Sequence, residues 1–213
     1  MIGALIALLL SWALLHFVEH QSLEVLGFRP TARRLKLVGL GFLLTAVFMS
    51  AYCLAEAAGW HFSYHRNPDF SARWLLTSLW AIFTSALFEE LLFRGALLYI
   101  LIRRIGPAKA VLVSAVAFGM YHWFIVGIHS LPQMILLFLS MAWMGYALAR
   151  SYVVTGSILV PLALHFAGNF IGADIFGDGP QLFVHAPGVH PSTVVLLLLV
   201  VIHNFVYPLV VLW

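Results

Sequence analysis

Seven apolar runs of 17 to 29 residues, joined by short polar connections, take up most of this chain. A helix that crosses the ~30 Å hydrocarbon core of a bilayer needs about 17–25 such residues. The chain is 63% hydrophobic and only 9% charged, whereas soluble domains carry about 25% charged residues. We therefore predict an all-α fold, a polytopic transmembrane helical bundle with about seven spans (six to eight).

The apolar runs lie at residues 1–18, 37–58, 74–102, 110–126, 133–149, 156–172 and 193–213. The first run has no Lys or Arg before it and no small-residue cleavage site, which favours a retained span over a cleaved signal peptide. The third run would extend roughly 43 Å as one helix, so we expect it to tilt or kink, with Gly95 as its weak point. No polar segment is long enough to fold separately, which predicts a single domain over 1–213.

The charges of the connections predict the orientation. Connections after the first, third and fifth runs hold eight basic residues, and those after the second, fourth and sixth runs hold two. Because cytoplasmic loops are enriched in Lys and Arg, we predict an N-terminus outside and a C-terminus in the cytoplasm. Topology explains these charges, so no nucleic-acid partner is expected. The eight are Arg29, Arg33, Arg34, Lys36, Arg103, Arg104, Lys109 and Arg150, and the two are Arg66 and Arg73.

The segments between the runs give further expectations. Apolar side chains in the first connection should rest on the membrane surface, namely Leu23, Val25, Leu26 and Phe28. Residues 150–155 and 173–192 are expected to be loops. The fifth run has no ionisable side chain apart from Tyr146, so we expect it to serve packing.

Two carboxylates and an arginine lie inside the third run, at Glu89, Glu90 and Arg94. A charge at membrane depth costs about 2.5–3.5 kcal/mol on insertion scales, so three of them need an explanation. On a helix, Glu90 and Arg94 are i,i+4 neighbours that can form an ion pair. Glu89 points about 100° away from Glu90. We predict that Glu90 is structural and that Glu89 does chemistry.

Two more runs carry polar or aromatic pairs four residues apart. The fourth run has Phe118 and His122, and the sixth has His165 and Asn169. Residues four apart share one helix face. Polar side chains at this depth normally face the bundle interior or a wet cavity. We therefore expect these pairs to meet the glutamate doublet in one layer.

Glutamate, two histidines and asparagine together can hydrolyse an amide or ester bond. A carboxylate and an imidazole can hold and deprotonate a water molecule as a general base. A second imidazole and a carboxamide can donate hydrogen bonds to the oxyanion of a tetrahedral intermediate, which can contribute ~3 kcal/mol for one donor. No serine or cysteine nucleophile is needed.

Two other interpretations of these residues stay open. His122, His165 and a glutamate could form a His₂-carboxylate site for a divalent zinc ion, although the usual HExxH helix is absent. The single cysteine, Cys53, cannot form an intrachain disulfide or a Cys-based zinc site. The side chains could also form satisfied hydrogen bonds that only hold the bundle together. His203, in the last run, is interpreted as structural, with a place in a cavity wall as its alternative.

The three motifs resemble those of a known family. Residues 89–95, EELLFRG, look like the EExxxRG motif of the CAAX-protease and bacteriocin-processing family of intramembrane proteases, which includes the type II CAAX prenyl endopeptidases. Residues 118–122 are similar to its FxxxH motif and residues 165–169 to its HxxxN motif. Residues 26–29, LGFR, resemble a signature near the start of such proteins. The motifs occur in the family's order, the resemblance covers about 26–172, and the motif core is about 74–172.

The resemblance implies roles for these residues. In that family the first glutamate and the FxxxH histidine, here Glu89 and His122, are held to activate water. The HxxxN pair, here His165 and Asn169, is held to form the oxyanion site. Glu90 and Arg94 would support the site, together with Phe118. The family has been argued to be glutamic or metal-dependent, so no cofactor is firmly expected, and a metal would be held by Glu89, His122 and His165.

The resemblance also implies a function. The chain is expected to be an intramembrane endopeptidase that cuts a membrane-associated or lipidated protein or peptide, in maturation, sorting or bacteriocin-type processing. Its partners would be membrane lipid and that substrate, and a bacterial-type member would lie in the inner membrane of a prokaryotic cell. We expect the chain to lack the helix before the first run that longer members have, and it shows no prenyl-recognition signal. The alternatives are a proton-coupled transporter and a catalytically inactive membrane scaffold.

Overall fold

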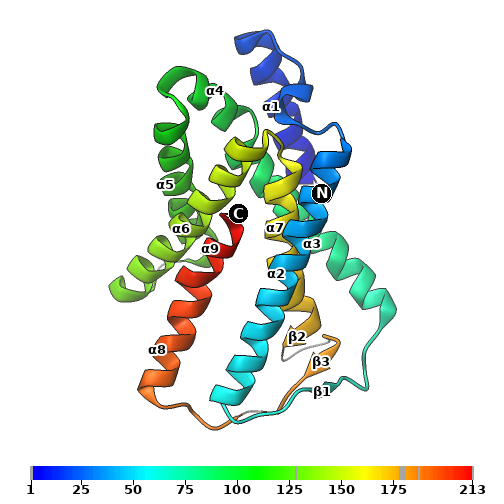
Figure 1. Cartoon of the computed structure of the whole chain (residues 1–213), viewed down its shortest axis with the longest axis vertical. Helices are drawn as coiled ribbons and strands as arrows, with labels where there is room; N and C mark the ends of the chain where they lie inside the picture. The colour runs from blue at the N-terminus through cyan, green and yellow to red at the C-terminus, as the bar shows by residue number, and fades with distance from the viewer. Residues whose placement is uncertain (1, 128, 178–180, 187, 213) are drawn as a thin grey trace.

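Helices form nearly all of the regular structure in the computed structural model, which describes residues 2–127, 129–177, 181–186 and 188–212 (Figure 1). Met1 and Trp213, predicted ends of the first and last runs, lie outside the described residues. The helices are α1 (Ile2–Glu19), η1 (Leu23–Leu26), α2 (Ala32–Gly59), α3 (Ala72–Arg94), α4 (Ala96–Ile105), α5 (Pro107–Val126), α6 (Leu131–Thr155), α7 (Leu159–Phe170), the π-helix η2 (Ile171–Ile175), α8 (Thr193–Val201), the π-helix η3 (Ile202–Val206) and α9 (Tyr207–Val211).

Three two-residue strands lie in the connections at one end of the bundle, β1 (His65–Arg66), β2 (Phe176–Gly177) and β3 (Phe183–Val184). β3 lies between the other two, antiparallel to β1 and parallel to β2. Residues 173–192, predicted as loop, therefore contain the end of η2 and two short strands. The strands join the α2–α3 connection to the α7–α8 connection.

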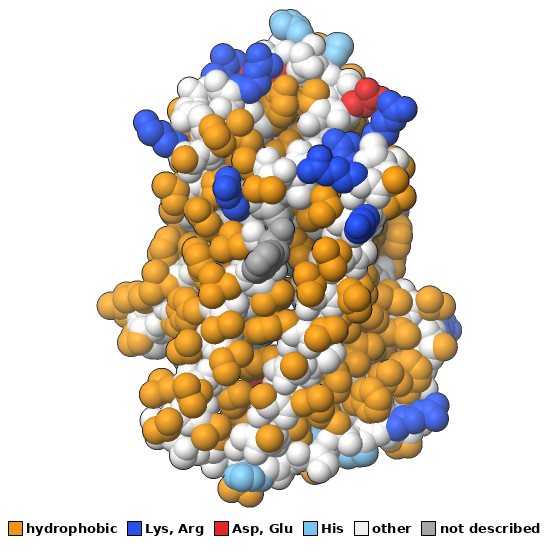
Figure 2. All heavy atoms as spheres, viewed as in Figure 1, with side chains coloured by type: hydrophobic (Ala, Val, Ile, Leu, Met, Phe, Trp, Pro, Cys, Tyr) orange, Lys and Arg blue, Asp and Glu red, His pale blue; other side chains and the backbone are white. Residues whose placement is uncertain are grey.

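The described helices confirm the prediction of an all-α membrane bundle. Four are long and apolar enough to cross a membrane, Ala32–Gly59, Pro107–Val126, Leu131–Thr155 and Thr193–Val211, with mean hydropathy between 1.5 and 2.6. Ile2–Val18 and Leu159–Ile175 are shorter apolar helices. Apolar side chains cover the middle of the molecule, as expected of a surface that faces lipid tails (Figure 2).

The connections alternate between the two ends of the bundle. Those between α1 and α2, α4 and α5, and α6 and α7 lie toward one end, where Lys and Arg side chains gather (Figures 1 and 2). The strands and the start of α8 lie at the opposite end. The predicted orientation, with the N-terminus outside and the C-terminus in the cytoplasm, requires these basic connections to share one side of the membrane.

The third apolar run breaks where its length and Gly95 predicted a weak point. α3 ends at Arg94 and α4 begins at Ala96, with Gly95 at φ −79° and ψ −140° between them. A Cβ at this position would collide with the carbonyl oxygen of Leu91 and would lie 2.8 Å from Ser11 Oγ of α1. Glycine therefore lets α1 approach the break closely.

The predicted loop at 150–155 is wrong, because α6 continues to Thr155. Arg150 suggested the end of the span, but a polar residue does not end a helix. α6 ends instead at Gly156, which has φ +62° and caps the helix in the left-handed conformation that glycine adopts readily. Ser151 and Tyr152, in the extra turns, are buried.

The LGFR segment does not lie on the membrane surface as a whole. Leu26 is fully buried, and its carbonyl accepts a hydrogen bond from the backbone N–H of Ile158 at 2.9 Å. Ser157 Oγ donates to the carbonyl of Gly27 at 2.8 Å. The expectation failed for Leu26 because these bonds tie the segment to the turn between α6 and α7.

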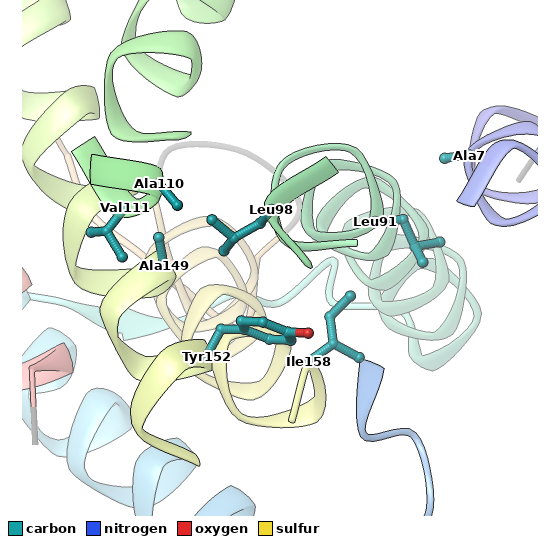
Figure 3. Packing of buried hydrophobic residues seen from close by; sticks show 8 residues of the cluster. All are labelled: Ala7, Leu91, Leu98, Ala110, Val111, Ala149, Tyr152 and Ile158. Carbon is teal, nitrogen blue, oxygen red and sulfur yellow. The ribbon is translucent and has the colours of Figure 1, made fainter. Parts of the chain in front are cut away.

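A cluster of buried apolar side chains holds the motif helix in place. Leu98 of α4 points toward Ala110, Val111 and Ala149 of α5 and α6, and Tyr152 lies beside Ile158 (Figure 3). Leu91 belongs to the same cluster and follows Glu90 directly in sequence. Packing around Leu91 therefore fixes the rotation of α3, and with it the directions of Glu89 and Glu90.

Replacing Gly27 with alanine should destabilise the protein more than replacing Gly106. Both glycines have positive φ, +76° and +80°, which L side chains rarely adopt, so each substitution costs about 1–3 kcal/mol in backbone strain. A Cβ at Gly27 would also collide with the carbonyl of Gly156, whereas one at Gly106 would meet nothing within 4 Å. We expect a further cost of about 1–3 kcal/mol for Gly27→Ala. Thermal unfolding in detergent measures the difference, and equal Tm values would contradict the clash.

Candidate active site

A fully buried ion pair lies at the centre of the bundle. Arg94 Nη1 donates to Glu90 Oε1 at 3.1 Å, and both side chains have no exposed surface. The two residues are one helical turn apart on α3, which is the pairing that the sequence predicts. A buried charge is tolerated only when it is paired and its remaining polar atoms find partners.

The other terminal nitrogen of the guanidinium group reaches a neighbouring helix, whereas Arg94 Nε and Glu90 Oε2 are buried without a hydrogen-bond partner among the described residues. Arg94 Nη2 donates to the carbonyl oxygen of Gly145 on α6 at 3.0 Å. The guanidinium carbon lies 4.4 Å from the ring centre of Phe118 on α5, which is cation–π geometry. Phe118 of the FxxxH motif thus covers Arg94.

Glu90 has a second partner that the sequence analysis did not predict. His165 Nδ1 lies 2.8 Å from Glu90 Oε1, the oxygen that also accepts from Arg94. The two residues are 75 positions apart, so no local spacing connects them. A carboxylate only accepts hydrogen bonds, so His165 Nδ1 carries the proton and its Nε2 points elsewhere. Glu90 therefore orients His165 as well as pairing with Arg94.

The other carboxylate faces a cavity. Glu89 Oε2 lies 3.9 Å from His165 Nε2 and has no hydrogen-bond partner among the residues that the structure describes. The cavity has a volume of about 190 Å³. Its lining comes from α2, α3, α5, α6, α7 and the C-terminal helices, and consists of Met49, Glu89, Phe118, His122, Ser140, Met141, Met144, His165, Gly168, Asn169, His203, Asn204 and Tyr207. The predicted layer is therefore present: Glu89, His122, His165 and Asn169 share one cavity, and Glu90 and Arg94 lie behind it.

Hydrogen bonding also orients His122. Its Nδ1 lies 2.8 Å from the carbonyl oxygen of Phe118, one turn earlier on α5. A carbonyl oxygen is only an acceptor, so Nδ1 is the donor and the neutral ring keeps Nε2 as an acceptor. The spacing of the FxxxH motif thus selects the tautomer that can take a proton at Nε2.

Glycines let the helices approach closely at the site. A Cβ at Gly145 of α6 would lie 2.9 Å from Phe118 Cβ, and one at Gly119 of α5 would lie 3.0 Å from Ala142 Cβ. Close contact between α5 and α6 brings the Gly145 carbonyl to Arg94. The fifth run, predicted to serve packing, therefore also supplies a polar contact to Arg94, and Gly145 is its signal in the sequence.

The C-terminal segment completes the site. The hydroxyl group of Tyr207 donates to the Leu164 carbonyl at 3.3 Å and fills the space that a Cβ at Gly168 would need. Gly168 lies inside the HxxxN motif, directly before Asn169. His203, interpreted from sequence as structural, lines the cavity with Asn204. Sequence reasoning missed Tyr207 and Asn204 because their contribution depends on how the last helix packs.

The side chains do not form a ready metal site. Among the described residues, no group of three or more His, Cys, Asp or Glu side chains is placed so that it could hold a metal ion. His122 Nδ1 and His165 Nδ1 are engaged with Phe118 and Glu90. These bonds leave Nε2 of each ring available, and a zinc ion held by Glu89, His122 and His165 stays a prediction.

The fold and the site together define a class, namely integral membrane helical bundles that gather acid–base side chains in a cavity between the helices. Residues 71–171 match the family model described as type II CAAX prenyl endopeptidase Rce1-like. This match confirms the predicted resemblance of residues 71–171 to the CAAX-protease family. No curated protein and no solved structure gave a significant match.

Glu90→Gln should destabilise the protein much more than Glu89→Gln. The first substitution leaves Arg94 charged and buried without its anion, which typically costs 3–5 kcal/mol. Glu89 borders the cavity, and its nearest basic atom is 3.9 Å away. In thermal unfolding in detergent, the drop in Tm caused by Glu90→Gln should be at least about twice the drop caused by Glu89→Gln. Equal stability of the two variants would refute this division of roles.

Proposed function

We propose that this protein is an intramembrane endopeptidase that hydrolyses a peptide bond with water held between Glu89 and His122. The observation that carries the proposal is the shared cavity, because three helices place Glu89, His122, His165 and Asn169 around it. The Rce1-like family match supports peptide-bond cleavage as the reaction class. Hydrolysis by water activated in this way requires no serine or cysteine nucleophile.

The attacking step follows from the free atoms of the two side chains. Glu89 Oε2 has no partner among the described residues, and His122 keeps Nε2 as an acceptor. Together they can hold one water molecule and orient its lone pair toward a substrate carbonyl. Glu89 takes one proton from the water as the oxygen attacks the carbonyl carbon, which gives a tetrahedral intermediate. General base catalysis of this kind contributes typically 10²–10⁴-fold.

The second half of the site stabilises the oxyanion. Asn169 can donate from Nδ2, and His165 can donate from Nε2 when its ring is protonated. The carboxylates of Glu90 and Glu89 lie 2.8 Å and 3.9 Å from the two ring nitrogens of His165 and hold the ring beside the cavity. When the intermediate collapses, the C–N bond breaks and the proton held by Glu89 passes to the leaving amine.

The surroundings of the cavity favour a substrate that is itself held by the membrane. At about 190 Å³ the cavity is smaller than the 300–1,000 Å³ typical of ligand pockets, so it accommodates the bond that is cut and little more. The rest of the substrate must lie along the helices, whose outer surface is apolar (Figure 2). A membrane-associated or lipidated peptide fits this surface, and lipid is its other partner.

Glu89→Ala should abolish cleavage while leaving the fold intact. Purified protein in detergent is incubated with a quenched peptide library that includes lipidated members, and fluorescence release is recorded. We expect a loss of at least about 10²-fold in cleavage rate, because the general base is gone. Glu24→Ala, at an exposed glutamate in η1, is the matched control and should cleave like the wild type.

A strong chelator separates the two ways of activating water. Because no group of three metal-ligating side chains is formed among the described residues, we expect cleavage to survive the chelator. Cleavage that is lost with the chelator and restored by zinc would instead indicate the His₂-carboxylate site. If the wild type cuts no peptide, the transporter or inactive-scaffold alternatives replace the protease.

Asn169→Leu should lower kcat with little change in KM. The substitution has similar volume but removes the carboxamide donor, and loss of one oxyanion donor costs about 10²–10³-fold in kcat. Steady-state kinetics on the best cleaved peptide measures both parameters. A rise in KM at constant kcat would show that Asn169 binds the substrate rather than its transition state.

A further inference from the structure

The wall of the cavity contains two polar side chains that lie outside the segment matched by the family. His203 and Asn204 belong to η3, about thirty residues after the match ends at 171. Both line the cavity with Glu89, His122, His165 and Asn169. The other non-motif side chains around it are mostly apolar, Met49, Met141, Met144 and Tyr207. His203 and Asn204 thus add polar groups for which the reaction described above has no use.

The backbone around these residues holds them in place. η3 is a π-helix, and such insertions re-aim side chains and occur frequently at functional sites. Trp143 Nε1 on α6 donates to the carbonyl of Phe205 at 3.0 Å, which ties the wider turn to its neighbour. Tyr207 docks on α7 at Gly168. The two side chains therefore have fixed positions relative to the HxxxN motif.

Both residues keep hydrogen-bonding capacity that the described part of the chain does not use. His203 packs its ring 4.8 Å from that of Tyr52, and its Nδ1 is buried with no partner among the described residues. Asn204 donates from Nδ2 to the Val200 carbonyl at 2.9 Å, and its Oδ1 accepts no hydrogen bond from the described residues. Ser140, by contrast, is engaged with the Leu137 carbonyl at 3.0 Å. An unpartnered buried polar atom is costly and points to a function.

We propose that His203 and Asn204 form a subsite that binds the main chain of the substrate next to the bond that is cut. A peptide drawn into a cavity inside the membrane loses water from its N–H and C=O groups, and each needs a new partner. Asn204 Oδ1 can accept from a substrate N–H, and a His203 ring nitrogen can donate to the adjacent C=O. The subsite rests on the proposed endopeptidase function, and it contributes to binding and not to the chemical step.

Binding to an inactive enzyme tests the subsite apart from catalysis. The probes are the library peptides, lipidated members included, each carrying a fluorescent label, and their affinity for Glu89→Gln protein in detergent is measured by fluorescence polarisation. His203→Phe keeps the ring that packs on Tyr52, and Asn204→Leu keeps the volume. On the Glu89→Gln background, each should weaken binding of the tightest peptide about tenfold, as expected for one lost hydrogen bond to a buried partner.

Modified peptides connect Asn204 to one substrate atom. N-methylation of the single amide that Asn204 binds should weaken binding to Glu89→Gln protein about tenfold. The same peptide should lose nothing further on the Asn204→Leu protein, because the hydrogen bond is already absent. If the loss of affinity caused by N-methylation adds to the loss caused by Asn204→Leu at every methylated position, the proposed contact between Asn204 and a substrate amide is wrong. This comparison also works if His203→Phe fails to fold.

Matched controls separate binding from general damage. His190→Phe, at an exposed histidine before α8, and Val206→Leu, in η3 but outside the cavity lining, should bind like the parent. Unchanged binding by both test variants overturns the subsite, whatever happens to their cleavage rates. If a peptide binds to the wild type but is not cut, the binding subsite is supported and the proposed endopeptidase function is refuted. If no peptide binds or is cut, both proposals fail.

Discussion

The contact between Glu90, Arg94 and His165 is the constraint on which the rest of the site depends. Two charges without exposed surface can stay inside a membrane bundle only if the surrounding helices supply partners. α7 supplies His165, α6 supplies the carbonyl of Gly145, and α5 supplies the ring of Phe118. Four helices therefore have to pack in one arrangement around a single ion pair.

This arrangement leaves the neighbouring glutamate free. Glu89 is rotated about 100° from Glu90 on the same helix, so the packing that buries Glu90 directs Glu89 to the cavity. Glu90 in turn fixes the proton of His165 on Nδ1 and directs Nε2 toward Glu89. The doublet of the EExxxRG motif thus links structure to the proposed chemistry, because Glu90 holds His165 beside the position where Glu89 is proposed to act.

The sequence predicted what depends on local spacing and missed what depends on packing. Apolar runs, the break at Gly95 and the Glu90–Arg94 pair follow from hydropathy and helical periodicity, which a single segment contains. The bond between Glu90 and His165 depends on the relative rotation of two helices far apart in sequence. The burial of Leu26 and the end of α6 at Gly156 were misjudged because charged neighbours, Arg29 and Arg150, suggested a polar environment.

The motif residues of the cavity can be recognised from local spacing, whereas the cavity residues of the last helix depend on packing. EExxxRG, FxxxH and HxxxN each fit on one helix and lie inside the matched segment, so they can be recognised in sequence. The last helix has no such motif, yet Tyr207 occupies the space beside Gly168 and brings His203 and Asn204 to the wall. A bundle that keeps its three motifs can change this helix without disturbing Glu89 or His122. Under the proposed function, the identity of the bound peptide can therefore change through the last helix while the pair proposed to activate water, Glu89 and His122, stays the same.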